Sequence, residues 1–69
     1  MPYAVEIEQE VDNRWIAEIP GLPGCLVYGA TRDEALSRVT VLALRILADR
    51  IEHGEHPADV VGVFAVAAA

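Results

Sequence analysis

The 69-residue chain has a single cysteine, no lysine and few aromatic side chains. A lone cysteine, Cys25, excludes an internal disulfide. The five basic residues are all arginines, set against eleven acidic residues, and the net charge of −6 argues against direct binding to a nucleic-acid backbone. Such a charge suits a basic protein partner, or it serves only to keep a small apolar domain soluble.

Long hydrophobic runs are also missing. The apolar residues 60–69 make up roughly half the length of a membrane-spanning helix. In residues 1–10, acidic side chains alternate with other residues. A secretion signal would instead have a basic stretch followed by an apolar one. We therefore expect a cytoplasmic protein without a membrane segment. A chain of 69 residues, 54% of them hydrophobic, should form a single domain over residues 1–69 and should gain stability by oligomerisation.

Two alternating segments, residues 3–9 and 14–19, predict a β-hairpin with one apolar and one polar face. A three-residue loop, residues 11–13, with Asn13 in the left-handed conformation, keeps the apolar side chains on the same face. This register gives the cross-strand pairs Val5–Ile19, Ile7–Ala17, Gln9–Trp15, Glu6–Glu18 and Glu10–Arg14.

Two further strands are predicted. The proline- and glycine-rich residues 20–24 end the second strand, because proline has no backbone donor for a ladder. Residues 25–28 then indicate a short third strand, and the β-branched and aromatic residues 60–66 indicate a fourth. With a helix between them, the predicted fold class is α+β with the order β-β-β-α-β.

One helix is predicted over residues 32–53. Thr31 and Glu34 form a capping box, in which each side chain satisfies a free backbone amide of the first turn. Gly54 ends the helix, because glycine adopts the left-handed conformation without strain. One stripe of the helix packs on the sheet, so the predicted core comprises Val5, Ile7, Trp15, Ala17, Ile19, Cys25, Ala35, Leu36, Val39, Leu42, Ala43, Ile46 and Leu47.

A second stripe of the helix points away from this core. Its small or apolar residues are spaced four, three, four and three apart: Ser37, Val41, Leu44, Ala48 and Ile51. This spacing is typical of a helix-helix seam, so we expect the chain to bind itself as a dimer or higher oligomer. The alternative is that the fourth strand provides the contact by edge pairing.

Candidate catalytic and metal-binding groups are present, but each has a simpler interpretation. Glu6, Glu8, Glu18 and Glu34 could suggest the carboxylates of a two-metal nuclease, although the strand glutamates lie on an ordinary solvent face. The segment Glu52-His53-Gly54-Glu55-His56 lacks the spacing of a zinc site, and His53 suits the negative end of the helix dipole. We expect no catalysis, no cofactor and no metal.

Three motifs after the Trp15 hairpin carry a family resemblance: Leu22-Pro23-Gly24-Cys25, Tyr28-Gly29-Ala30-Thr31 and Asp33-Glu34-Ala35. Residues 3–64 resemble the HicB-like antitoxin family, and specifically its antitoxin domain without the C-terminal DNA-binding module of many members. The resemblance implies a truncated ribonuclease H-like fold, with the fourth strand beside the first. It also implies a partner, because members of the family neutralise HicA, a small basic RNA-cleaving toxin, by covering its active surface.

On this basis the predicted function is binding of a basic HicA-like toxin. The candidate toxin interface is the acidic face of the sheet with a neighbouring aromatic residue: Glu6, Glu8, Glu18 and Tyr28. The alternative is a stand-alone homo-oligomeric interaction or ligand-binding protein without a toxin partner.

Overall fold

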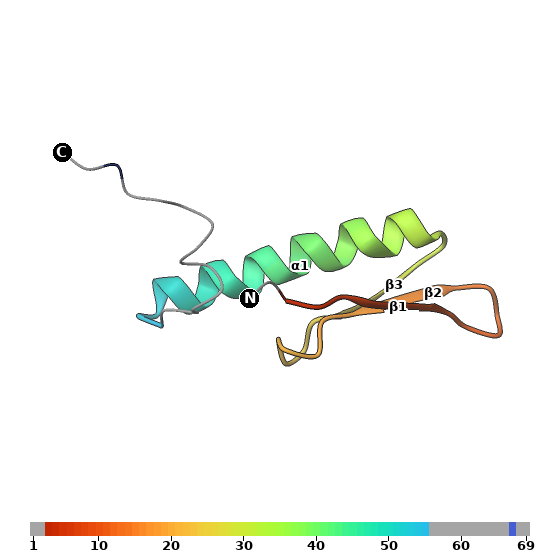
Figure 1. Cartoon of the computed structure of the whole chain (residues 1–69), viewed down its shortest axis with the longest axis horizontal. Helices are drawn as coiled ribbons and strands as arrows, with labels where there is room; N and C mark the ends of the chain where they lie inside the picture. Colours follow the sequence, from red (N-terminus) through yellow and green to blue (C-terminus); the bar gives the residue numbers. More distant parts are fainter. Residues whose placement is uncertain (1–2, 56–66, 68–69) are drawn as a thin grey trace.

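The computed structural model describes residues 3–55 and residue 67. Strands β1 (Glu6–Gln9), β2 (Trp15–Glu18) and β3 (Leu26–Gly29) precede a single helix, α1 (Arg32–Glu52). The strands form an antiparallel sheet in the order β1-β2-β3, and α1 runs along one face of it (Figure 1). The predicted α+β class is thus confirmed for this part of the chain. The predicted fourth strand, residues 60–66, lies outside the described residues.

The hairpin of β1 and β2 has the predicted register, with the pairs Glu6–Glu18, Ile7–Ala17, Glu8–Ile16 and Gln9–Trp15. Asn13 has a φ of 70°, in the left-handed region. The backbone N–H of Glu10 donates to the Arg14 carbonyl across the loop, at 2.7 Å. The paired strands are shorter than the predicted segments, and β3 begins one residue later than predicted.

The N-terminus of α1 is capped by only half of the predicted box. The Thr31 hydroxyl accepts a hydrogen bond from the backbone N–H of Glu34, at 3.1 Å. The Glu34 carboxylate does not return to the backbone of Thr31, because it pairs with the Arg38 guanidinium at 2.9 Å. A charged partner one turn along the helix competes well with a neutral amide, so this part of the prediction was wrong.

The C-terminus of α1 closes as predicted at Gly54, whose φ is 86°. The last helical residue is Glu52 and His53 is the C-cap, so the helix ends one residue earlier than the predicted range of 32–53. The backbone N–H groups of Gly54 and Glu55 donate to the carbonyls of Ile51 and Arg50, at 3.1 and 2.9 Å. These two hydrogen bonds satisfy carbonyls that the helix itself leaves free.

The core lies between α1 and the sheet. Its buried residues are Ala17, Ile19, Leu22, Cys25, Ala35, Val39 and Ala43, and further predicted core residues pack half-buried against them: Ile7, Trp15, Leu36, Leu42, Ile46 and Leu47. Val5 is 41% exposed, so its assignment to the core was wrong. It precedes the first paired residue of β1, an edge strand, where a side chain has fewer neighbours.

Cys25 is buried as predicted, and burial raises the pKa of its thiol. The Sγ atom lies 3.8 Å from the carbonyl oxygen of Val39 in α1. A protonated, enclosed thiol is a packing group rather than a nucleophile.

Two close contacts fix α1 on β3. A Cβ atom at Gly29 would lie 2.5 Å from the backbone nitrogen of Ala35, so only glycine allows this approach. The guanidinium of Arg38 also donates to the Tyr28 carbonyl, at 2.9 Å. Among the described residues, no helix has both the length and the apolar character needed to cross a membrane.

Candidate functional site

The face of the sheet turned away from α1, here called the outer sheet face, carries two rows of side chains. The register of the three strands gives the rows Glu6–Glu18–Leu26 and Glu8–Ile16–Tyr28. All six residues are exposed or half-buried. Residues that alternate with them point toward the core beneath α1, so the helix leaves this face open (Figure 1).

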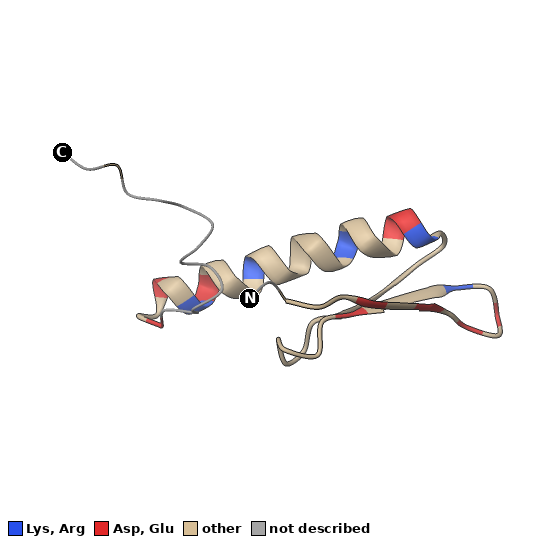
Figure 2. Ribbon diagram, viewed as in Figure 1, with Lys and Arg blue, Asp and Glu red and all other residues tan. Residues whose placement is uncertain are grey.

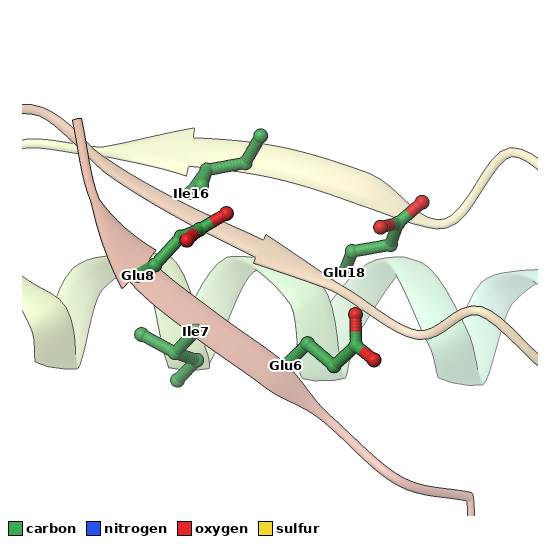
Figure 3. A pocket seen from close by; sticks show the side chains of 5 residues that line it. All are labelled: Glu6, Ile7, Glu8, Ile16 and Glu18. Atoms are coloured by element: carbon green, nitrogen blue, oxygen red, sulfur yellow. The ribbon is translucent and has the colours of Figure 1, made fainter.

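Three carboxylates cluster on the β1 and β2 side of the outer sheet face. Figure 2 shows the acidic positions along these two strands in red. Glu6 and Glu18 are direct cross-strand neighbours, which places their Cβ atoms roughly 5 Å apart. With Glu8 they border a hollow of about 230 Å³ that Ile7 and Ile16 complete (Figure 3). No basic side chain lines this hollow, so its charge is negative.

The β3 side of the same face is apolar. Leu26 and Tyr28 are each 41% exposed. Ile16 lies between Tyr28 and Glu8, and Leu26 lies directly beside Glu18. The Arg14 guanidinium stacks over the Tyr28 ring, 4.7 Å from its centroid. Arg14 also pairs with Asp12 at 2.7 Å, and hydrogen bonds from its backbone and side chain lower the pKa of the Asp12 carboxyl. The one arginine at this end is therefore neutralised locally.

All four residues of the predicted toxin interface, Glu6, Glu8, Glu18 and Tyr28, lie on the outer sheet face. Sequence reasoning missed the apolar part, Ile16 and Leu26. A signal was available at Ile16, because it is an isoleucine between Arg14 and Glu18 on the polar side of an alternating strand. An apolar residue on the polar side of a strand indicates a surface that can bind a partner.

The fourth carboxylate considered for a nuclease, Glu34, is not brought to the other three. Glu34 lies in the first turn of α1, where it pairs with Arg38. The strand glutamates lie on the face of the sheet that α1 does not cover. Among the described residues, no three histidine, cysteine or acidic side chains lie close enough to hold a metal ion. His56, which the sequence also brought into consideration, lies outside the described residues.

His53 occupies the end of α1, as its place in the sequence suggested. Its Nδ1 atom lies 2.7 Å from the Asp49 carbonyl oxygen and 3.4 Å from the Asp49 carboxylate. The hydrogen bond and the charge of Asp49 raise the pKa of His53. Asp49 therefore pairs with His53, one turn along the helix.

The second predicted surface is the apolar helix stripe: Ser37, Val41, Leu44, Ala48 and Ile51. All five residues are exposed in the single chain. The exposed fractions of Val41, Leu44 and Ile51 are 48%, 62% and 44%. A shallow hollow of about 410 Å³ joins the stripe to β3, and its lining consists of Val27, Ser37, Arg38, Val41, Leu42 and Arg45.

These features define an α+β protein with two separate exposed surfaces, one acidic and apolar on the sheet and one apolar on the helix. The chain is similar to two curated proteins over 39 residues: a UPF0150 protein of Thermoplasma acidophilum, at 38% identity, and a UPF0150 protein of Archaeoglobus fulgidus, at 36%. Each match covers 56% of this chain and 56% of the relative, so the similarity spans little more than half the length of either. No family model and no solved structure matches the chain.

Proposed function

We propose that this chain is a HicB-like, antitoxin-type binding module that captures a small basic protein of the HicA-like RNA-cleaving class on its outer sheet face. The observation that supports the proposal most strongly is that three carboxylates lie beside a partly exposed apolar strip on the outer sheet face. The strip consists of Ile16, Leu26 and Tyr28. The motifs from Leu22 to Ala35 support the choice of partner, through their resemblance to HicB-like antitoxins.

The two halves of the outer sheet face have different tasks in this proposal. Carboxylates accelerate association with a basic surface and select it over acidic ones. The exposed apolar side chains, with Tyr28 as the aromatic anchor, supply the area that slows dissociation. An arginine or lysine head group placed between Glu6 and Glu18 would also relieve the repulsion between these two opposed charges.

The proposal also includes a fourth strand and a location in the cytoplasm. Residues 60–66 would form a fourth strand beside β1, giving the truncated ribonuclease H-like arrangement. Such a strand would cover the exposed Val5 at the edge of the sheet. The cytoplasm is the compartment in which an RNA-cleaving toxin would need to be neutralised.

A second candidate function is that of a stand-alone homo-oligomer without a toxin. The exposure of Val41, Leu44 and Ile51 favours it, because three large apolar side chains in water on one helix face form a patch that association would cover. The two functions are compatible, because the stripe and the outer sheet face lie on opposite sides of the molecule.

The test is rescue of growth. A HicA-like partner would be encoded beside this chain, as a basic protein of about 60 to 80 residues. Expressed alone it should arrest growth, and co-expression of this chain should restore it. Joint Glu6→Arg and Glu18→Arg substitution should abolish rescue, whereas Val11→Glu, at a fully exposed loop position, should not. Absence of such a neighbour, or growth arrest despite co-expression, would leave the stand-alone homo-oligomer.

A further inference from the structure

The apolar helix stripe is complementary to itself when a second copy is laid against it in the opposite direction. Ser37 and Ile51 mark its two ends, and Leu44 lies midway between them. Reversal about Leu44 therefore places Ser37 against Ile51, a small residue against a large one. The same reversal places Leu44 against itself and brings Val41 to within one residue of Ala48, again large beside small.

Alternation of large and small residues is what allows two helix surfaces to interdigitate without voids. A parallel arrangement lacks this property, because every residue then meets its own copy. Ile51 would meet Ile51 and Ser37 would meet Ser37, which crowds one end of the contact and leaves the other loose. The pattern of side-chain sizes thus selects the antiparallel arrangement.

The charges that border the stripe select the same arrangement. Arg38, Asp49 and Glu52 lie along one flank of the stripe, and Arg38 also pairs with Glu34 of its own helix. In an antiparallel two-fold pair the equivalent flanks of both helices lie on the same side, so Arg38 of each copy comes beside Asp49 and Glu52 of the other. Arg45, which lies nearer the centre, lines the hollow beside β3.

The geometry of α1 permits this contact. The stripe is on the side of the helix opposite the buried Ala35, Val39 and Ala43, so the sheet does not obstruct a second helix. From Ser37 to Ile51 the contact would extend about 21 Å. Such a contact is short for an obligate interface, so its strength should depend visibly on protein concentration.

We propose that the chain forms a two-fold dimer through antiparallel packing of α1, with the two Leu44 side chains on the axis. The dimer supplies an interface for the homo-oligomer described above and does not require a basic partner. Because the helices meet at the centre, the two outer sheet faces point away from each other and both stay open. The dimer therefore presents two acidic faces, and each can take one basic partner.

Sedimentation of the full chain alone tests the association. The parent should be a dimer at high concentration and dissociate on dilution. Leu44→Glu places two carboxylates on the axis and should raise the dissociation constant at least about thirtyfold, the effect of losing a hot-spot residue. Val11→Glu makes the same charge change at a loop position that is fully exposed, and should leave the constant within about twofold. A monomeric parent, or a dimer that Leu44→Glu leaves intact, would overturn the proposal.

Disulfide trapping tests the direction of the helices. Chains carrying Ser37→Cys mixed with chains carrying Ile51→Cys should form a cross-linked pair under mild oxidation, because antiparallel packing brings these positions within disulfide range. Leu44→Cys should cross-link to itself. Cys25 is buried and should not compete. Efficient cross-linking of Ser37→Cys to itself would indicate parallel packing and overturn the proposal, even if the basic-partner function stood.

Discussion

Gly29 shows how closely the backbones of β3 and α1 approach each other. A Cβ atom there would lie 2.5 Å from the backbone nitrogen and 2.9 Å from the Cα atom of Ala35. Both are backbone atoms, so the first turn of α1 would have to move to make room. Glycine at this position therefore sets the distance between the helix and the sheet.

Gly29→Ala should destabilise the protein by about 1 to 3 kcal/mol, the usual cost of forcing extra volume into a packed site. Thermal unfolding followed by circular dichroism measures this loss. Gly24→Ala is the matched comparison, because a Cβ there meets no atom within 4 Å and the cost arises only from the φ of 83°. A Gly29→Ala protein that melts with the parent would show that the close approach is not needed.

Leu22 is a residue whose role the sequence pattern did not reveal. It lies in a proline- and glycine-rich segment that correctly predicted a turn. Its N–H donates to the Ile19 carbonyl and its carbonyl accepts from the N–H of Cys25, at 2.9 and 3.0 Å. These bonds fold the loop so that the Leu22 side chain is only 1% exposed. An irregular turn has no side-chain period, so alternation gives no indication of which of its residues is buried.

The regular elements were more predictable than the single residues. The hairpin register follows from alternation, because a slip of one residue would turn every apolar side chain of β2 to the wrong face. The ends of α1 follow from Thr31 and Gly54, which act through the local backbone. By contrast, Arg38 makes one contact within its own helix, to Glu34, and a second to the Tyr28 carbonyl in β3. Local spacing predicts only the contact with Glu34.

The C-terminal end of α1 should make stability depend on pH. The folded-state pKa of His53 is raised above its ordinary value of 6.5 by the hydrogen bond and charge of Asp49. The native state thus favours the protonated imidazole. The stabilisation is complete below the unfolded pKa and is lost as the pH rises through the folded pKa.

The measurement is the difference in Tm between the parent and His53→Gln across this pH range. The Tm of the parent should exceed that of His53→Gln at a pH below about 6, and this difference should disappear in mildly alkaline solution. Asp49→Asn should reduce the pH dependence, because it removes the carboxylate while leaving the backbone carbonyl. A difference in Tm that is constant with pH would show that the imidazole charge does not stabilise this helix end.

At the scale of the whole molecule, the two exposed surfaces are separated by the layer of helix on sheet. Opposition of Glu6 to Glu18 was predictable from the hairpin alone, whereas the apolar strip beside them depends on the pairing of β3 with β2. A pairing between strands separated by a proline- and glycine-rich loop is not fixed by local sequence. The combined surface is therefore a property of the sheet, and the proposed function depends on it.

The most direct test of that function is the rate of association with a catalytically inactive variant of the proposed HicA-like toxin. The parent should bind rapidly at low ionic strength, and its rate should fall steeply as salt is added. With both Glu6→Arg and Glu18→Arg, the rate at low salt should drop at least about tenfold and become nearly independent of salt, while Val11→Glu remains as fast as the parent. Equal rates for the parent and the charge-reversed protein, or no binding by the parent, would contradict the assignment of the outer sheet face.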